Sequence, residues 1–145
     1  MMSARGGPVQ ALAHVALAVP DADAAAQRFV AALGATRGAE ETLDDGALRV
    51  VFLHLGPVTL ELLEPHSSDH AVARFLDKRG PGLHHVSFEV DDLEGALARA
   101  KEAGVELIDS TPRPGAHDSQ VAFLHPKSLF GVLVELCQSR PGSSG

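Results

Sequence analysis

The feature that most constrains the fold of this 145-residue chain is an internal repeat. A strand-like segment that opens on His14 is matched by one that opens on His85, 71 residues later (85 − 14). The letters Phe-Leu-His also occur twice, at residues 52–54 and 123–125. This spacing exceeds the roughly 20–50 residues of stacked solenoid repeats. We therefore interpret the chain as two copies of one module; the alternative is a chance similarity between two strand–helix segments.

Each copy has the pattern of one strand, one helix and three further strands, which predicts an α+β fold built from two tandem βαβββ modules. In the first copy Pro20 ends a strand, Asp21 caps a helix and Gly34 closes it. The elements expected in the first half are a helix at 24–33 and strands at 11–19, 36–42, 47–55 and 58–63. Those expected in the second half are a helix at 93–103, a loop at 111–118 and strands at 85–90, 105–108, 120–125 and 131–137. A short helix capped by Ser68 should connect the halves.

The same plan sets the expected domain boundaries. We expect a single domain over residues 9–138, which is an ordinary size for one domain. Its parts are a first module at 9–66, a connecting helix at 67–80 and a second module at 82–138, with flexible ends at 1–8 and 139–145.

Composition excludes several classes of partner. A formal net charge of −7 opposes binding to nucleic acid or to an anionic membrane surface. No apolar run approaches the roughly 18 residues that span a bilayer, and the first residues lack the apolar core of a secretory signal. The single Cys137 cannot form an internal disulfide. The sequence therefore predicts a cytoplasmic protein without a nucleic-acid or membrane partner.

Period-two alternation divides the side chains of each strand between two faces. In the first strand Leu17 and Val19 should meet the helix, which leaves His14 on the opposite face. The last strand of each module carries a glutamate among apolar residues, Glu61 in the first and Glu135 in the second. A carboxylate buried there without a partner costs several kcal/mol, and a divalent cation is one partner that offsets this cost.

The repeat thus places two imidazoles and two carboxylates symmetrically, and we interpret them as metal ligands: His14, Glu61, His85 and Glu135. Such a set suits a five- or six-coordinate site for Co²⁺, Mn²⁺, Ni²⁺, Fe²⁺ or Zn²⁺. The alternative is that each histidine bonds a backbone carbonyl and each glutamate faces solvent or an arginine. His84 has the opposite parity and is expected to be a structural or supporting imidazole.

The remaining polar candidates are expected to be structural. Asp91 and Asp92 fit a helix cap better than a catalytic pair. The other histidines should lie at rims or be solvated in loops: His54, His125, His66, His70 and His117.

These motifs resemble the vicinal oxygen chelate superfamily, and within it most closely the methylmalonyl-CoA epimerases, over about residues 12–138. The resemblance rests on segments 14–21, 61–65, 82–86, 123–127 and 131–136. It implies a curved mixed sheet around a metal site, with the helices on the outer face of the sheet. It also implies that the four residues named above bind a divalent ion. Co²⁺ is the most expected ion, followed by Mn²⁺, Ni²⁺ and Zn²⁺. The resemblance further implies an acyl-CoA substrate and a homodimer. Some relatives have Gln at the position of Glu61.

The resemblance also implies the reaction. An isomerase of this family would epimerise methylmalonyl-CoA by removing the α-proton, forming a metal-stabilised enediolate and returning a proton on the opposite face. The family's acidic loop residue matches Asp44, although relatives have Glu-X-Gly where this chain has Asp44-Asp45-Gly46, so Asp45 is an alternative. Glu135 would serve the other face.

Two rival functions use the same fold. A glyoxalase I-type enzyme has nearly the same four ligands but acts on a glutathione hemithioacetal. A metal-free binding protein that sequesters antibiotics needs no His/Glu set.

Overall fold

The computed structural model describes residues 7–140, and these fall into two compact units. One unit is His14–His85, and the other comprises the described residues on either side of it. The flexible ends predicted at 1–8 and 139–145 lie mostly outside the described residues. Within residues 7–140, no helix is long and apolar enough to cross a membrane.

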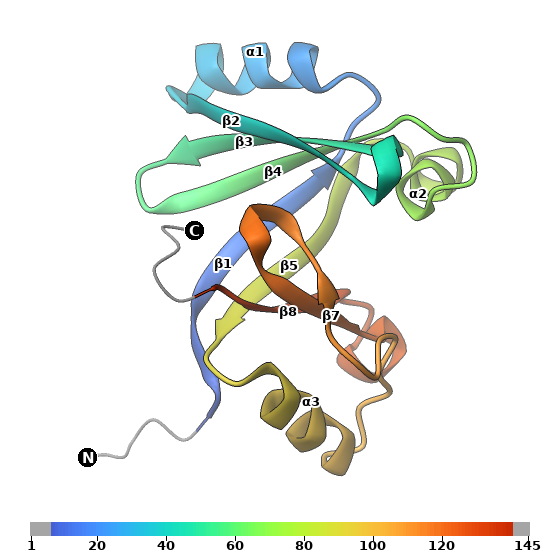
Figure 1. Cartoon of the computed structure of the whole chain (residues 1–145). Helices are drawn as coiled ribbons and strands as arrows, with labels where there is room; N and C mark the ends of the chain where they lie inside the picture. The colour runs from blue at the N-terminus through green and yellow to red at the C-terminus, as the bar shows by residue number, and fades with distance from the viewer. Residues whose placement is uncertain (1–6, 141–145) are drawn as a thin grey trace. The chain divides into compact units, whose positions relative to one another are not determined.

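The unit His14–His85 holds the first module, with its strands in the order β2-β3-β4-β1 (Figure 1). Its elements are β1 (Val9–Ala18, which begins in the other unit), α1 (Ala22–Leu33), β2 (Thr36–Leu43), β3 (Leu48–Leu55), β4 (Val58–Pro65) and α2 (Ala71–Arg79). Strands β1 and β4 are parallel, with Ala16 opposite Glu61, and the other pairs are antiparallel. The strands are therefore of mixed direction, as predicted.

Helix α1 has the predicted caps and ends at the predicted residue, but it begins at Ala22, two residues earlier than expected. Asp21 has extended backbone angles, and its Oδ1 accepts a hydrogen bond from the backbone N–H of Ala24 at 3.1 Å. Gly34 adopts a left-handed conformation (φ 73°) and its N–H donates to the carbonyl of Val30. Both terminal contacts satisfy backbone groups that a helix leaves without intrahelical partners.

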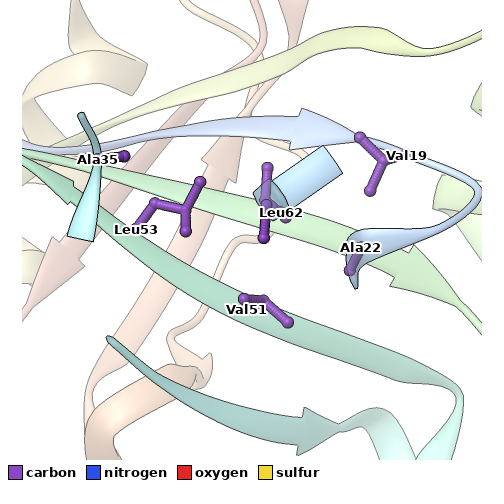
Figure 2. Close-up of a cluster of buried hydrophobic side chains, with 7 residues drawn as sticks. Val19, Ala22, Ala35, Val51, Leu53 and Leu62 are labelled. Carbon is purple, nitrogen blue, oxygen red and sulfur yellow. The ribbon is translucent and has the colours of Figure 1, made fainter. Parts of the chain in front are cut away.

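One face of the first module's strands packs against α1 through a cluster of buried side chains (Figure 2). The cluster consists of Val19, Ala22, Ala26, Ala35, Val51, Leu53 and Leu62. Leu17 packs at its edge, which confirms that the apolar residues of β1 face the helix. Side chains alternate between the two faces of a strand, so His14 of β1 and Glu61 of β4 lie on the face opposite α1.

The other unit holds the second module, with its strands in the order β5-β8-β7-β6. Its elements are β5 (Gly82–Val90, from Val86 onward), α3 (Leu93–Glu102), β6 (Arg113–Pro114), β7 (Gln120–Leu124) and β8 (Val134–Gln138). Asp92 caps α3 by accepting from the N–H of Gly95 at 3.1 Å, which supports the interpretation of this aspartate as a cap. A core cluster that includes Leu93, Leu97 and Leu136 joins α3 to the strands. The α+β plan of two βαβββ modules is thus confirmed.

Two predicted strands of the second module differ from the observed ones. The strand expected at 105–108 is wrong: only Leu107 forms an isolated bridge, and the edge strand is β6, within the predicted loop. The N–H groups of Ile108 and Asp109 both donate to the carbonyl of Phe123, so a regular ladder cannot continue there.

The last strand also begins three residues later than predicted, at Val134 instead of residue 131. A 3₁₀ turn, η3 (Pro126–Leu129), occupies the connection from β7. Phe130 and Gly131 follow it with φ angles of 57° and 90°, outside the range of a strand.

Candidate metal centre

Three of the predicted ligands meet within the unit His14–His85. The parallel register of β1 and β4 sets Glu61 opposite Ala16, two residues along the same face from His14. His14 Nδ1 lies 3.0 Å from Glu61 Oε2, and His14 Nε2 lies 3.2 Å from His85 Nε2. All three residues are buried, at 6–9% exposure. The structure therefore brings His14, Glu61 and His85 together on the face opposite α1.

The contact with Glu61 indicates which nitrogen of His14 is protonated. A carboxylate has no proton to donate, so we place the proton of the neutral ring on His14 Nδ1, the nitrogen that lies 3.0 Å from Glu61 Oε2. In the neutral ring Nε2 then has a lone pair, and this is the atom that faces His85. A metal-binding histidine characteristically donates its second nitrogen in this way to a carboxylate.

The separation of the two Nε2 atoms fits two ligands of one ion. Imidazole nitrogens bind Zn²⁺ and similar ions at about 2.0–2.1 Å, which separates neighbouring ligands by about 2.9 Å at a right angle and about 3.4 Å at a tetrahedral angle. The observed 3.2 Å lies between these values. Two imidazoles beside a carboxylate are also a donor set that first-row divalent metals prefer. The residues of this face therefore fit a divalent cation.

His84 contacts the side of His85 that does not face His14. The two Nδ1 atoms are 2.9 Å apart, and the His84 ring packs edge-on against Phe75 of α2, with centroids 5.0 Å apart. Burial, and secondarily the charge of nearby His70, lower the pKa of His84 to about 4. His84 is therefore a neutral imidazole at physiological pH, in keeping with the supporting role predicted for it.

Glu135 belongs to the other unit, where it lies in the middle of β8. It is opposite Ser87 of β5 in the parallel register and opposite Phe123 of β7 in the antiparallel one. It is 7% exposed and points away from the face that α3 covers, because Leu136 is the residue that packs there. Burial of this carboxylate on the face away from the helix agrees with the parity argument.

Asp44 lies in η1 (Asp44–Gly46), the 3₁₀ turn between β2 and β3, and its contact is with His70. Asp44 Oδ2 is 2.7 Å from His70 Nε2. His70 Nδ1 accepts from the N–H of Val72 at 3.0 Å, so Nε2 is the protonated nitrogen and donates to the carboxylate. Asp45, the alternative to Asp44, is exposed in the same turn.

The strand register places Asp44 well away from Glu61. Glu61 is opposite Phe52 of β3, whereas Leu48, the first residue of β3 after the turn, is opposite Pro65. The four residues from 61 to 65 correspond to a rise of about 13 Å. The structure therefore brings Asp44 against His70 and does not bring it against the His14–Glu61 pair.

The role of His70 is the main feature that the sequence analysis missed. His70 was expected to be solvated, but its side chain caps α2, which begins at Ala71, so the predicted cap at Ser68 is wrong. A histidine is an uncommon helix cap, and propensity favours the serine. The available signal was the position of His70 directly before the apolar periodicity of the helix.

Comparisons with known proteins place this fold and site in context. The family model for the glyoxalase/bleomycin resistance protein/dioxygenase superfamily matches residues 13–123. The ethylmalonyl-CoA/methylmalonyl-CoA epimerase of Cereibacter sphaeroides is 44% identical over 129 residues, which cover 88% of this chain and 96% of that protein.

Solved structures of methylmalonyl-CoA epimerases are also similar to this chain. The crystal structure of methylmalonyl-CoA epimerase from Mycobacterium tuberculosis superposes with a TM-score of 0.88 and 36% identity, covering 94% of this chain and 92% of that one. A methylmalonyl-CoA epimerase in complex with methylmalonyl-CoA and NH₄⁺ superposes with a TM-score of 0.87 and 32% identity, covering 94% and 99%.

Proposed function

We propose that this chain, which belongs to the glyoxalase/bleomycin resistance protein/dioxygenase superfamily and within it to the methylmalonyl-CoA epimerase family, interconverts the R and S epimers of methylmalonyl-CoA. The observation that carries the proposal is the convergence of His14 Nε2 and His85 Nε2 at 3.2 Å in a chain 44% identical to an epimerase. A complex of a related epimerase with methylmalonyl-CoA supports an acyl-CoA as the substrate class.

His14, His85 and Glu135 are the proposed ligands of a divalent cation. Glu135 is included because of its place in the strand register. It is opposite Ser87 of β5, and Ser87 is two residues from His85, so its side chain lies on the same face of that strand. Glu61 is the proposed fourth ligand, and its Oε2 lies 3.0 Å from His14 Nδ1. Co²⁺ is the first candidate, and Mn²⁺, Ni²⁺ and Zn²⁺ suit the same donors. When bound, the cation would stabilise the negative charge that develops on the substrate oxygens as the α-proton leaves.

Two carboxylates are proposed to move the proton. The carboxylate on one face of the α-carbon takes the proton, and the carboxylic acid on the other face returns one, so that the configuration inverts. Glu135 is proposed for one face and Asp44 for the other. Asp44 Oδ2 accepts a hydrogen bond from His70 Nε2 at 2.7 Å, so His70 is the residue that orients this carboxylate. Asp45 is the alternative residue in the same turn.

Proton exchange in D₂O tests the proposal. Metal-loaded protein should exchange the α-proton of methylmalonyl-CoA and interconvert its epimers, and a chelator should abolish both. Asp44→Asn should lower epimerisation by about 10²–10⁴-fold, the usual contribution of a positioned acid or base, while Asp45→Asn remains active. The reverse pattern would assign the role to Asp45. Metal-loaded protein without exchange would overturn the epimerase function.

The rival functions have their own readouts in the same samples. Turnover of methylglyoxal with glutathione would indicate a glyoxalase I-type enzyme. A chain that binds no stoichiometric metal would be a binding protein of this fold. We also propose, from the family resemblance, a cytoplasmic homodimer, which light scattering on the purified chain would test.

A further inference from the structure

We propose that His84 is a positioning residue that accepts a hydrogen bond from His85 Nδ1 and so holds His85 in the tautomer able to bind a metal ion. This inference rests on the proposed function, because it takes His85 as a ligand. The observation is the 2.9 Å separation of His84 Nδ1 and His85 Nδ1, on the side of the His85 ring away from His14.

Only one proton fits between the two Nδ1 atoms, so one ring donates and the other accepts. If His84 donates, the neutral His85 ring carries its proton on Nε2 and has no lone pair for an ion. If His85 donates, its Nε2 carries the lone pair that an ion needs, and the proton of His84 is on Nε2. The second arrangement is the only one of the two that is compatible with metal binding.

Packing against α2 fixes the orientation of the His84 ring. The ring meets Phe75 edge-on at 64°, with centroids 5.0 Å apart. The guanidinium of Arg79 in turn lies 5.6 Å from the centroid of the Phe75 ring. A residue that orients a metal ligand must itself be held in one rotamer, and this contact provides that restraint.

Metal titrations of matched variants test the proposal. His84→Phe keeps an aromatic ring beside Phe75 but cannot accept from His85, and we expect about 10–100-fold weaker binding of Co²⁺ or Zn²⁺, the usual loss when such a partner is removed. His84→Asn places an amide that can donate or accept near the position of Nδ1, and it should recover most of the affinity. His66→Phe makes the same change at an exposed histidine and should bind like the parent.

The ring nitrogens of the unsubstituted protein give a second readout that does not depend on folding of a variant. Long-range ¹⁵N–¹H spectra of histidine-labelled, Zn²⁺-loaded protein should show His85 protonated at Nδ1 and His84 protonated at Nε2. A His84 protonated at Nδ1 in the Zn²⁺-loaded protein, or a His84→Phe variant that binds as tightly as the parent, would overturn the inference. A parent protein without stoichiometric metal would instead overturn the proposed metal site, so the two failures are distinguishable.

Discussion

Replacement of Glu61 distinguishes two alternative roles, as the acceptor that orients His14 or as a ligand, because one carboxylate cannot fill both for the same ion. Glu61→Leu removes both, and it leaves the Nδ1–H of His14 without the acceptor it has at 3.0 Å. Loss of a partner that orients a metal-binding histidine typically weakens binding by about 10–100-fold. At about 1.4 kcal/mol for each factor of ten, this is roughly 1.4–2.8 kcal/mol of binding free energy. Glu61→Gln keeps an amide oxygen that can accept from Nδ1–H, and its loss should not exceed about tenfold.

Isothermal titration of metal-free protein with Co²⁺ measures these affinities, and urea unfolding of the same samples shows whether the fold is intact. Both side chains are 11% exposed, so loss of this contact should also cost the Leu variant about 1–3 kcal/mol of unfolding free energy when no metal is added. Equal affinities for Glu61→Gln and Glu61→Leu would refute the orienting role of the hydrogen bond. Unchanged affinity in Glu61→Leu would refute both roles.

Three further predictions concern the fold that supports the site. Leu62 is fully buried in the cluster beneath α1, so Leu62→Ala should lower the unfolding free energy by about 3–5 kcal/mol without moving Glu61 to the other face. Urea titrations measure this loss, and a value below 1 kcal/mol would contradict the packing. Asp92→Ala should lower the unfolding free energy by about 0.5–2 kcal/mol, because the hydrogen bond from the N–H of Gly95 is lost, while epimerisation persists. Asp92→Asn should lower it by less. Loss of activity in a folded Asp92→Asn variant would argue for a catalytic role. The hydrogen bonds from Arg49 and then Arg37 lower the pKa of Asp23 from 3.8 to about 2, so its contribution to stability is present above pH 3.8 and is lost as the pH falls through about 2. Urea midpoints measured between pH 5 and pH 2.5 should therefore fall less steeply in Asp23→Asn than in the parent, and parallel curves would contradict this sign.

The parts of the site that lie on regular strands could be predicted from the sequence. Alternation in β1 distinguishes Leu17, which packs toward α1, from His14, which does not. The same argument separates His85 from His84. These predictions succeed because a strand has a strict period of two and one of its faces is covered by a helix.

The parts that depend on where separate segments meet could not be predicted. Asp44 and His70 are 26 residues apart, and their contact depends on the conformation of the η1 turn and on the residue at which α2 begins. The failed strand at 105–108 has a similar cause, because one carbonyl, that of Phe123, accepts from two successive N–H groups. Neither outcome is encoded in the periodicity of a single segment.

The connection between β7 and β8 has a consequence for protein engineering. From His54 to Glu61 the first module uses 7 residues (61 − 54), whereas the second uses 10 from His125 to Glu135 (135 − 125). The shorter connection has a glycine, Gly56, at its left-handed position (φ 58°), but the longer one places Phe130 there (φ 57°), at a cost of about 1–2 kcal/mol for a residue with a Cβ. The first half of the chain therefore supplies a natural, unstrained template from which a shorter loop for the second half can be grafted.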